Sequence, residues 1–430
     1  METNCSCWAA DDVVSSTQKR QDYSVMQPQS NKPRLIVVSP FLDKRHGTER
    51  CVAEQVERLS NEYEVHLYSE RVEDMDLSKI KWHRVPVPPG PHVFRYLWWL
   101  LANHICRWID CRLRGLHPDV VYSPGVNCVD ADVIAVHIVF AEFQEQVSRE
   151  LKLRRNPLRS WPVLLHRRMY YRLCEFLERR AYRNDRVVLV AVSEKTARAV
   201  VNFCGRKGPV DVVYNGLNTE RFNPCRRVAM RASARATLGL PEDAFVVLLV
   251  GNDWKKKGLP HLLEAAGRLG DPHLRLLVVG RDTAAPYREI VGRLGIAGQV
   301  SFLPLRPDVE FYYAAADAYV GPSLDDSFAL PPAEAMACGL PVITSRCNGG
   351  SAIIHHGTDG LILEDPSDTK TLSEWLARLA NDADWRSLLG EAAARTAAEY
   401  TWERNASHMR DAIERARIAR QKTTSGARSE

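Results

Sequence analysis

Short runs of consecutive apolar residues recur along this chain, separated by longer stretches in which apolar residues return every three or four positions. The runs are rich in Val, Ile and Leu, which is typical of strands buried on both faces of a sheet. In the first half they predict strands at 34–39, 64–68, 82–87, 119–122, 132–137, 187–193 and 210–214. In the second half they predict strands at 245–251, 274–280, 300–303, 318–321 and 341–345.

The intervening stretches predict helices, among them 48–59, 93–113, 259–269, 286–294, 368–380 and 383–398. Apolar strands that alternate with helices favour parallel sheets covered on both faces. Because the pattern starts again near Leu240, we expect an α/β fold of two facing Rossmann-like domains. Ligands bind beyond the carboxyl ends of such strands, so the cleft between the halves is the expected site.

Composition is consistent with two ordinary globular domains, since 430 residues with 45% hydrophobic and 26% charged side chains can bury two cores. Residues 1–31 are polar and predict a flexible leader without a secretory signal. No apolar run is long enough to predict a membrane-spanning helix. Eleven dispersed cysteines without metal-ligand spacing indicate reduced thiols, so we expect a cytoplasmic protein.

The segment 317–350 carries the most chemical information. Val320 ends a predicted strand, Asp326 lies in the following loop, and Glu334 comes eight residues later on a helix that stops at Gly339. The N–H groups at a helix start attract phosphate, and carboxylates beside them can accept hydrogen bonds from hydroxyls. A nucleotide sugar offers both kinds of group, so the segment predicts a site for one.

This segment resembles the signature of the retaining glycosyltransferases of family four, which is Glu-x7-Glu around Gly-Phe-Gly-Leu-Pro, followed by Glu-Ala-Met-Ala-Cys-Gly-x-Pro-Val. Asp326 stands at the first Glu and Glu334 at the second, while Ser327 and Ala329 stand where Gly is usual. The positions that fit are Phe328, Leu330, Pro331, Ala335, Met336, Ala337, Gly339, Pro341 and Val342.

The resemblance covers roughly residues 34–405 and implies the GT-B fold, with an acceptor domain at 32–216 and a nucleotide-sugar domain at 217–399. It also implies that a final helix at about 400–416 crosses back to the first domain. Residues 417–430 are basic and predict a flexible tail.

Charged groups for the donor diphosphate are implied near the strand at 245–251. The resemblance places Lys257 on the diphosphate. Asn252 stands where Arg is usual and brings no charge, so either Lys255 or Lys256 makes up the difference or the diphosphate is bound less tightly. The alternative is that the three lysines form a solvated loop.

Backbone groups complete the implied diphosphate site. Gly47 opens the helix after the first strand in a loop where His46 replaces the first glycine of the family pattern. Phe328, Ala329 and Leu330 are expected to offer N–H groups to the distal phosphate at the other helix start.

Three side chains are implied to hold the sugars. Glu334 is expected on the nucleotide ribose, and Asp326 and His137 on the transferred sugar as the catalytic groups. The alternatives are purely structural: a loop or helix-cap role for Asp326 and a core role for His137. Arg50 faces the cleft or forms a surface salt bridge, and Ser193 is expected to be a helix N-cap.

The segment 149–186 is basic, with twelve Lys or Arg against four Asp or Glu, and it contains Trp161, Tyr170, Tyr171 and Phe176. A solvated helix face and contact with an anionic membrane surface or lipid acceptor are both open. No nucleic-acid recognition motif is present, and no nucleic-acid partner is expected.

The resemblance implies a retaining glycosyltransferase that moves a sugar from a nucleoside-diphosphate sugar to a carbohydrate or lipid-linked acceptor, as in polysaccharide, glycolipid or cell-envelope glycan synthesis. The family reaction needs no metal ion or other cofactor, and the leaving phosphate takes the acceptor proton. The Asp-x-Asp pairs at 130–132 and 382–384 are read as chance. Two alternatives stay open: a sugar-nucleotide epimerase or phosphorylase of the same fold, and a non-catalytic nucleotide-sugar- or membrane-binding module.

Overall fold

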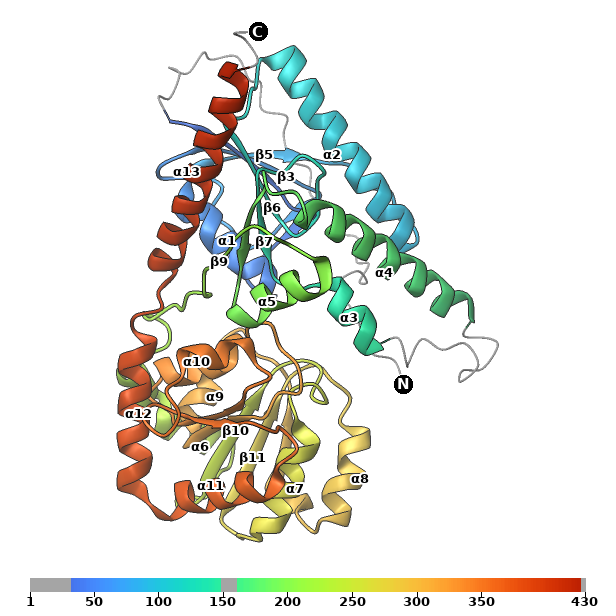
Figure 1. The fold of residues 1–430 in the computed structure, drawn as a ribbon. Coiled ribbons are helices and arrows are strands. Elements are labelled where there is room, and N and C mark those ends of the chain that lie inside the picture. The colour runs from blue at the N-terminus through green and yellow to red at the C-terminus, as the bar shows by residue number, and fades with distance from the viewer. Residues whose placement is uncertain (1–31, 148–160, 427–430) are drawn as a thin grey trace, which may run out of the picture.

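The computed structural model describes residues 32–147 and 161–426, which form two α/β domains, one above the other in Figure 1. The expected leader at 1–31 and the first part of the basic segment, 149–160, lie outside the described residues. Within the described ranges, no helix is both long and apolar enough to cross a membrane.

The first domain is built on a seven-stranded parallel sheet. In spatial order its strands are β5 (Ile80–Arg84), β3 (Glu64–Ser69), β1 (Arg34–Val38), β6 (Val120–Pro124), β7 (Val133–Val136), β8 (Val188–Ala191) and β9 (Val210–Val212). A small two-stranded sheet pairs β2 (Phe41–Leu42) with β4 (Arg71–Val72).

The second domain has a six-stranded parallel sheet. Its spatial order is β12 (Val300–Leu303), β11 (Leu274–Val279), β10 (Phe245–Val250), β13 (Ala318–Gly321), β14 (Val342–Ser345) and β15 (Leu361–Leu363). In both sheets the strand order reverses beside the first strand, between β1 and β6 and between β10 and β13. Ligands of open α/β sheets bind at such reversals, and the two reversals open on the same cleft.

Helices cover both faces of the first sheet, as the continuous apolar strands require. They are α1 (Gly47–Leu59), α2 (His92–Arg114), α3 (Phe140–Val147), α4 (Trp161–Tyr182), α5 (Glu194–Ala199) and the π-helical turn η3 (Val200–Cys204). Val56 of α1 packs in one core with Ile413 of the last helix, while Trp99 of α2 and Tyr182 of α4 belong to the core on the other face.

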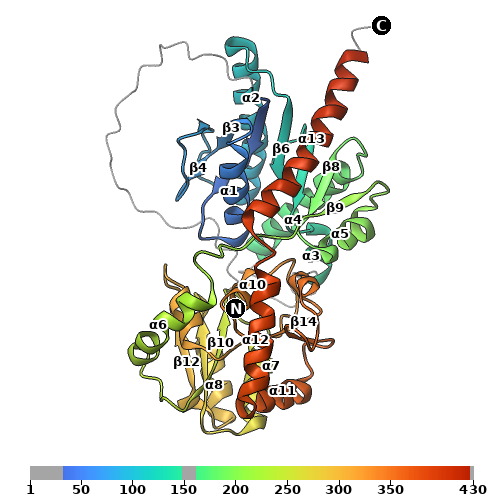
Figure 2. The same cartoon turned by 90° about the vertical axis from the view of Figure 1, so that its left-hand side faces the viewer.

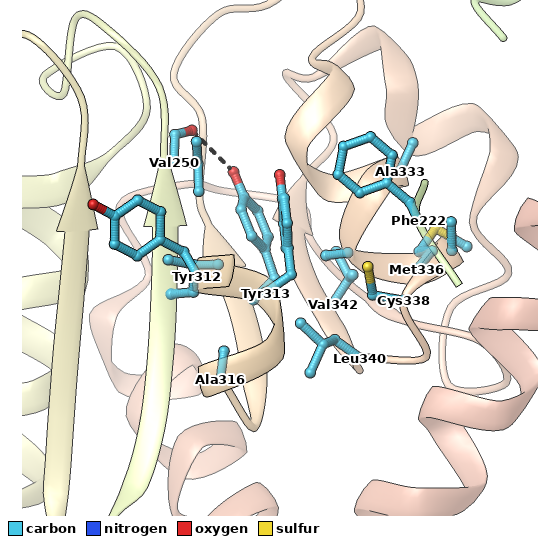
Figure 3. Packing of buried hydrophobic residues seen from close by; sticks show 14 of the residues in the cluster. Phe222, Val250, Tyr312, Tyr313, Ala316, Ala333, Met336, Cys338, Leu340 and Val342 are labelled. Carbon is cyan, nitrogen blue, oxygen red and sulfur yellow. Dashed lines mark hydrogen bonds between the residues drawn. The ribbon is translucent and has the colours of Figure 1, made fainter. Parts of the chain in front are cut away.

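The second sheet is covered in the same way by α6 (Pro224–Thr237), α7 (Leu259–Leu269), α8 (Ala285–Arg293), α9 (Glu310–Ala315), α10 (Leu330–Ala337), α11 (Thr369–Asn381) and α12 (Ala383–Ala397), with short 3-10 turns at Ala297–Gln299 and Gly349–Ile353. One core joins α7 to α11 through Leu262 and Leu376. The other contains Tyr313 and Met336 and lies beneath the cleft; Figure 3 shows part of it.

The last helix, α13 (Trp402–Gly426), returns from the second domain and runs along the first (Figure 2). At the crossing, the Leu217 N–H donates to the Tyr400 carbonyl at 2.8 Å. A Cβ on Gly216 would lie 2.5 Å from the Trp402 backbone, so only glycine lets the two segments touch here. The return of the chain thus depends on close backbone contact.

The sequence predicts a flexible tail at residues 417–430. For residues 417–426 this prediction is wrong, because α13 continues to Gly426. Arg415 pairs with Asp211 and Arg420 with Asp132, both on the first domain. These ion pairs tie the basic end of the helix to the domain it crosses, and the local composition did not reveal them.

Candidate active site

A cleft of about 1050 Å³ lies between the domains. From the first domain it is lined by the loop between β2 and α1, the start of α1, the residue that follows β7, and α3. From the second it is lined by the loops that follow β10 and β11 and by the β13–α10 loop. The predicted site residues all line it, namely Gly47, His137, Asn252, Lys257, Asp326, Phe328, Ala329, Leu330 and Glu334. The structure therefore brings them together, while their individual roles stay predictions.

Lys257 and Asp326 form an ion pair inside the cleft. The Lys257 ammonium lies 2.8 and 3.0 Å from the two carboxylate oxygens, and both side chains are largely buried. Gly258 makes this geometry possible, since its φ is +80° and a Cβ there would lie 2.0 Å from the Pro322 carbonyl oxygen. The Asp326 carboxylate thus balances the charge of the Lys257 ammonium inside the cleft.

The two neighbouring lysines differ from Lys257. Lys255 is exposed, which fits the solvated-loop alternative for that residue only. Lys256 lines the cleft with its ammonium 4.6 Å from the centre of the Phe143 ring, a cation–π contact with the first domain. Of the two residues considered to compensate for Asn252, only Lys256 therefore lines the cleft.

Arg281 is a cleft cation that the sequence analysis missed. It follows β11 directly after Gly280, and its backbone N–H donates to the Asn252 side-chain oxygen at 3.0 Å. A polar residue just beyond the carboxyl end of a buried strand is the signal in the sequence that points to Arg281.

Glu334 is held by a largely buried arginine and a buried tyrosine. Arg50 donates to one carboxylate oxygen at 2.8 Å, and the Tyr313 hydroxyl donates to the other at 2.9 Å. Burial by itself would lower the pKa of Arg50, but the adjacent carboxylate outweighs it and raises that pKa. Arg50 thus faces the cleft and forms an interdomain ion pair rather than a surface salt bridge. A ribose on Glu334 has to share the carboxylate with these partners or displace them.

One of the expected backbone donors is already occupied. The Ala329 N–H donates to the Asn348 side-chain oxygen at 3.1 Å, so a phosphate at this N–H would have to displace that hydrogen bond. Phe328 and Leu330 are left as the expected donors. Across the cleft, the His46 ring bonds to Asp43 at 2.6 Å and does not cap α1, and Gly47 at the start of that helix lines the cleft.

Polar contacts from the first domain also hold the loop that carries Asp326. Ser193 caps α5 as expected, accepting from the Thr196 N–H at 3.2 Å, and its hydroxyl donates to the Ser327 carbonyl at 2.7 Å. Lys195 pairs with Asp325 in the same loop. The acidic loop is therefore positioned by both domains at once.

The Asp-x-Asp pairs have structural partners. Asp130 makes a two-oxygen contact with Arg107, at 2.7 and 2.8 Å, and Asp132 accepts from the Val121 N–H at 2.8 Å. Asp382 is the N-cap of α12. Asp130, Asp132 and Asp382 thus each have a structural role.

His137 follows the last residue of β7 and is buried, and its Nε2 atom has no hydrogen-bond partner among the described residues. Desolvation lowers its pKa from the ordinary 6.5 to about 4. The imidazole is therefore neutral at physiological pH and can donate to or accept from a sugar hydroxyl.

This pKa predicts acid-sensitive stability. Because the unfolded chain binds the proton near pH 6.5 and the folded chain only near pH 4, stability should fall as the pH drops through that window. His137 alone should account for about 2 kcal/mol between neutral pH and about pH 5. Urea unfolding at several pH values should show this pH-dependent loss of stability in the wild type and its absence in His137→Asn. The exposed His104→Asn variant should keep the wild-type slope, and equal slopes for all three proteins would contradict the assignment.

Two family models match the chain, one on each domain. The model described as Glycosyltransferase Family 4 matches residues 45–221, and the model described as Glycosyl transferases group 1 matches residues 230–396. The chain belongs to the family-four glycosyltransferases. Among its curated relatives is a D-inositol 3-phosphate glycosyltransferase from Corynebacterium urealyticum, 32% identical over 250 residues. The match spans 55% of this chain and 58% of the relative, little more than half of each.

Solved structures confirm the GT-B fold expected for a family-four glycosyltransferase. Sucrose-phosphate synthase from Thermosynechococcus elongatus superposes with a TM-score of 0.70 at 20% identity, covering 92% of this chain and 100% of that one. HepE from Anabaena in complex with UDP-glucose gives 0.65 at 17% identity, covering 89% and 99%. At these identities the likeness is one of fold alone.

Proposed function

We propose that this protein is a retaining glycosyltransferase that moves a sugar from a nucleoside-diphosphate sugar to an acceptor hydroxyl. The observation that carries the proposal is the interdomain cleft in which Lys257, paired with Asp326, lies with buried Glu334 and the start of α10. The UDP-glucose bound to HepE supports a UDP-sugar as donor. The name of the curated relative supports a hydroxyl of an inositol phosphate or a similar polyol as acceptor.

In the proposed reaction, the bond from the anomeric carbon to the distal phosphate oxygen breaks while the acceptor oxygen bonds to the same face of that carbon. Negative charge grows on the departing diphosphate, where Lys257 and the N–H groups of Gly47, Phe328 and Leu330 stabilise it. The leaving phosphate oxygen takes the acceptor proton. His137 and Asp326 hold hydroxyls of the transferred sugar, and Glu334 holds the ribose.

No metal ion or other cofactor is part of this proposal. A fixed lysine ammonium supplies the positive charge that phosphate transfer often draws from Mg²⁺. The reaction is accordingly expected to proceed in the presence of a chelator.

The test begins with a panel of nucleotide sugars scanned by thermal shift, since a donor that binds the native state stabilises it. The stabilising donor is then incubated with candidate acceptors, with and without EDTA, and the anomeric configuration of the product is read by NMR. Transfer with retained configuration in both conditions is the expected result. Epimerised donor or released sugar phosphate would favour the rival enzymes, donor binding without turnover the non-catalytic module, and loss of activity in EDTA a metal-dependent reaction.

A further inference from the structure

Helix α2 presents a hydrophobic stripe to solvent along its whole length. Eight of its large hydrophobic side chains are exposed, and they recur every three or four residues, among them Leu97, Leu101, Ile105, Trp108 and Leu113. That spacing places them on one face. Leu101 and Trp108 are 56% and 55% exposed, so about half of each side chain is open to solvent. The opposite face of α2 already packs on the sheet through Trp99 and Ala102.

The charged side chains of α2 are four arginines and one acid, and Arg95, Arg107 and Arg114 are paired with carboxylates. The single acid of α2, Asp110, is buried and bonds to the Tyr68 hydroxyl at 2.7 Å and to Arg114 at 2.8 Å. Arg112 is exposed within the stripe near its end, and among the described residues no carboxylate pairs with it. A cationic apolar face of this kind is unusual for a surface that meets only water.

Helix α4 continues the same surface. The two helices touch near the start of α2, where Tyr96 meets Tyr170 edge-on at 5.8 Å, and both lie on the side of the first domain away from α13 (Figure 1). The exposed face of α4 mixes apolar and basic side chains, namely Leu165, Met169 and Phe176 with Arg168, Arg172 and Arg180. Its two acids are used elsewhere: Glu175 pairs with Arg179, and buried Glu178 accepts from the Phe140 N–H. We call these exposed faces of α2 and α4 the α2–α4 surface.

We propose that the α2–α4 surface is a peripheral docking site for an anionic lipid bilayer. Its apolar and Trp side chains would enter the interface between headgroups and acyl chains, and its arginines would meet lipid phosphates. Charge complementarity favours this partner over a second copy of the chain, because a twofold contact would set arginine against arginine. The inference does not depend on the proposed function, since it concerns a surface outside the cleft.

The test is sedimentation of the full-length protein with vesicles of phosphatidylcholine, with and without phosphatidylglycerol. The wild type should pellet with the anionic vesicles and release as salt is raised. Leu101→Glu combined with Trp108→Glu should lower the partition coefficient about tenfold or more. Replacing Arg168, Arg172 and Arg180 by Gln should lower it roughly a hundredfold, because each cation near an anionic surface contributes several-fold.

Control variants carry changes of the same kind on the second domain. Val228→Glu with Leu388→Glu alters two similarly exposed apolar residues, and Arg395→Gln removes an exposed arginine of α12; both should bind vesicles as the wild type does. Thermal unfolding verifies that each variant is folded. Equal binding by the α2 variant and its control would overturn the proposal. A wild type that does not bind anionic vesicles would also overturn it. So would a wild-type dimer that Leu101→Glu dissociates, because the surface would then be an interface between copies of the chain.

Discussion

Replacing Lys257 by alanine should lower kcat/KM for the nucleotide-sugar donor about a thousandfold, or roughly 4 kcal/mol of transition-state stabilisation. The ammonium lies in a cleft whose walls keep it largely buried, where a charge interacts more strongly than in water. The diphosphate gains negative charge as the sugar departs, so the loss should fall on turnover as well as on donor KM. Initial rates at varied donor concentration measure both.

The matched control for this prediction is Lys255→Ala. Lys255 lies two residues away in the same loop but is exposed, and its removal should change kcat/KM by no more than a factor of about two. Comparable losses in the two variants would mean that the loop contributes diffuse charge and that Lys257 has no special place. An unchanged rate in Lys257→Ala would remove this residue from the site.

Much of the fold follows from patterns within single segments. A run of consecutive apolar residues such as β10 is buried on both faces only when helices cover both sides of its sheet. Such runs therefore predict a parallel α/β architecture. The spacing of Asp326 and Glu334 spans one loop and one helix start, so the local pattern brings both to the same strand end. His137 and Gly47 were predicted from the resemblance to the family, which places both after strands of the first domain.

The contacts between the domains could not be predicted in this way. Arg50 and Glu334 are 284 residues apart, and no local pattern says which positions of the two domains will meet. Tyr313 looks like any core aromatic of α9, and only the packing shows its hydroxyl on Glu334. Apolar spacing in α2 predicts a helix, but apolar residues on both of its faces conceal which face is covered.

Breaking the Arg50–Glu334 pair should have the largest effect on stability. In Arg50→Met the carboxylate of Glu334, only 6% exposed, would keep its Tyr313 hydrogen bond but lose its cation. An uncompensated buried charge of this kind costs about 3 kcal/mol, so the free energy of unfolding should drop by that order. Urea unfolding followed by circular dichroism measures it, and the loss should also loosen the contact between the domains.

A double-mutant cycle separates this pair from simple loss of packing. Glu334→Gln removes the charge that Arg50 balances, so the double variant should be less destabilised than the sum of the single ones, by about 2 kcal/mol. Arg346→Met in the exposed pair with Glu364 is the control and should cost less than about 1 kcal/mol. Only Glu334→Gln should raise donor KM, because ribose binding is assigned to the carboxylate. Additive stabilities would show that Arg50 and Glu334 are not coupled, and an equal rise in KM for Arg50→Met would show that donor binding depends on Arg50 as well as on the carboxylate.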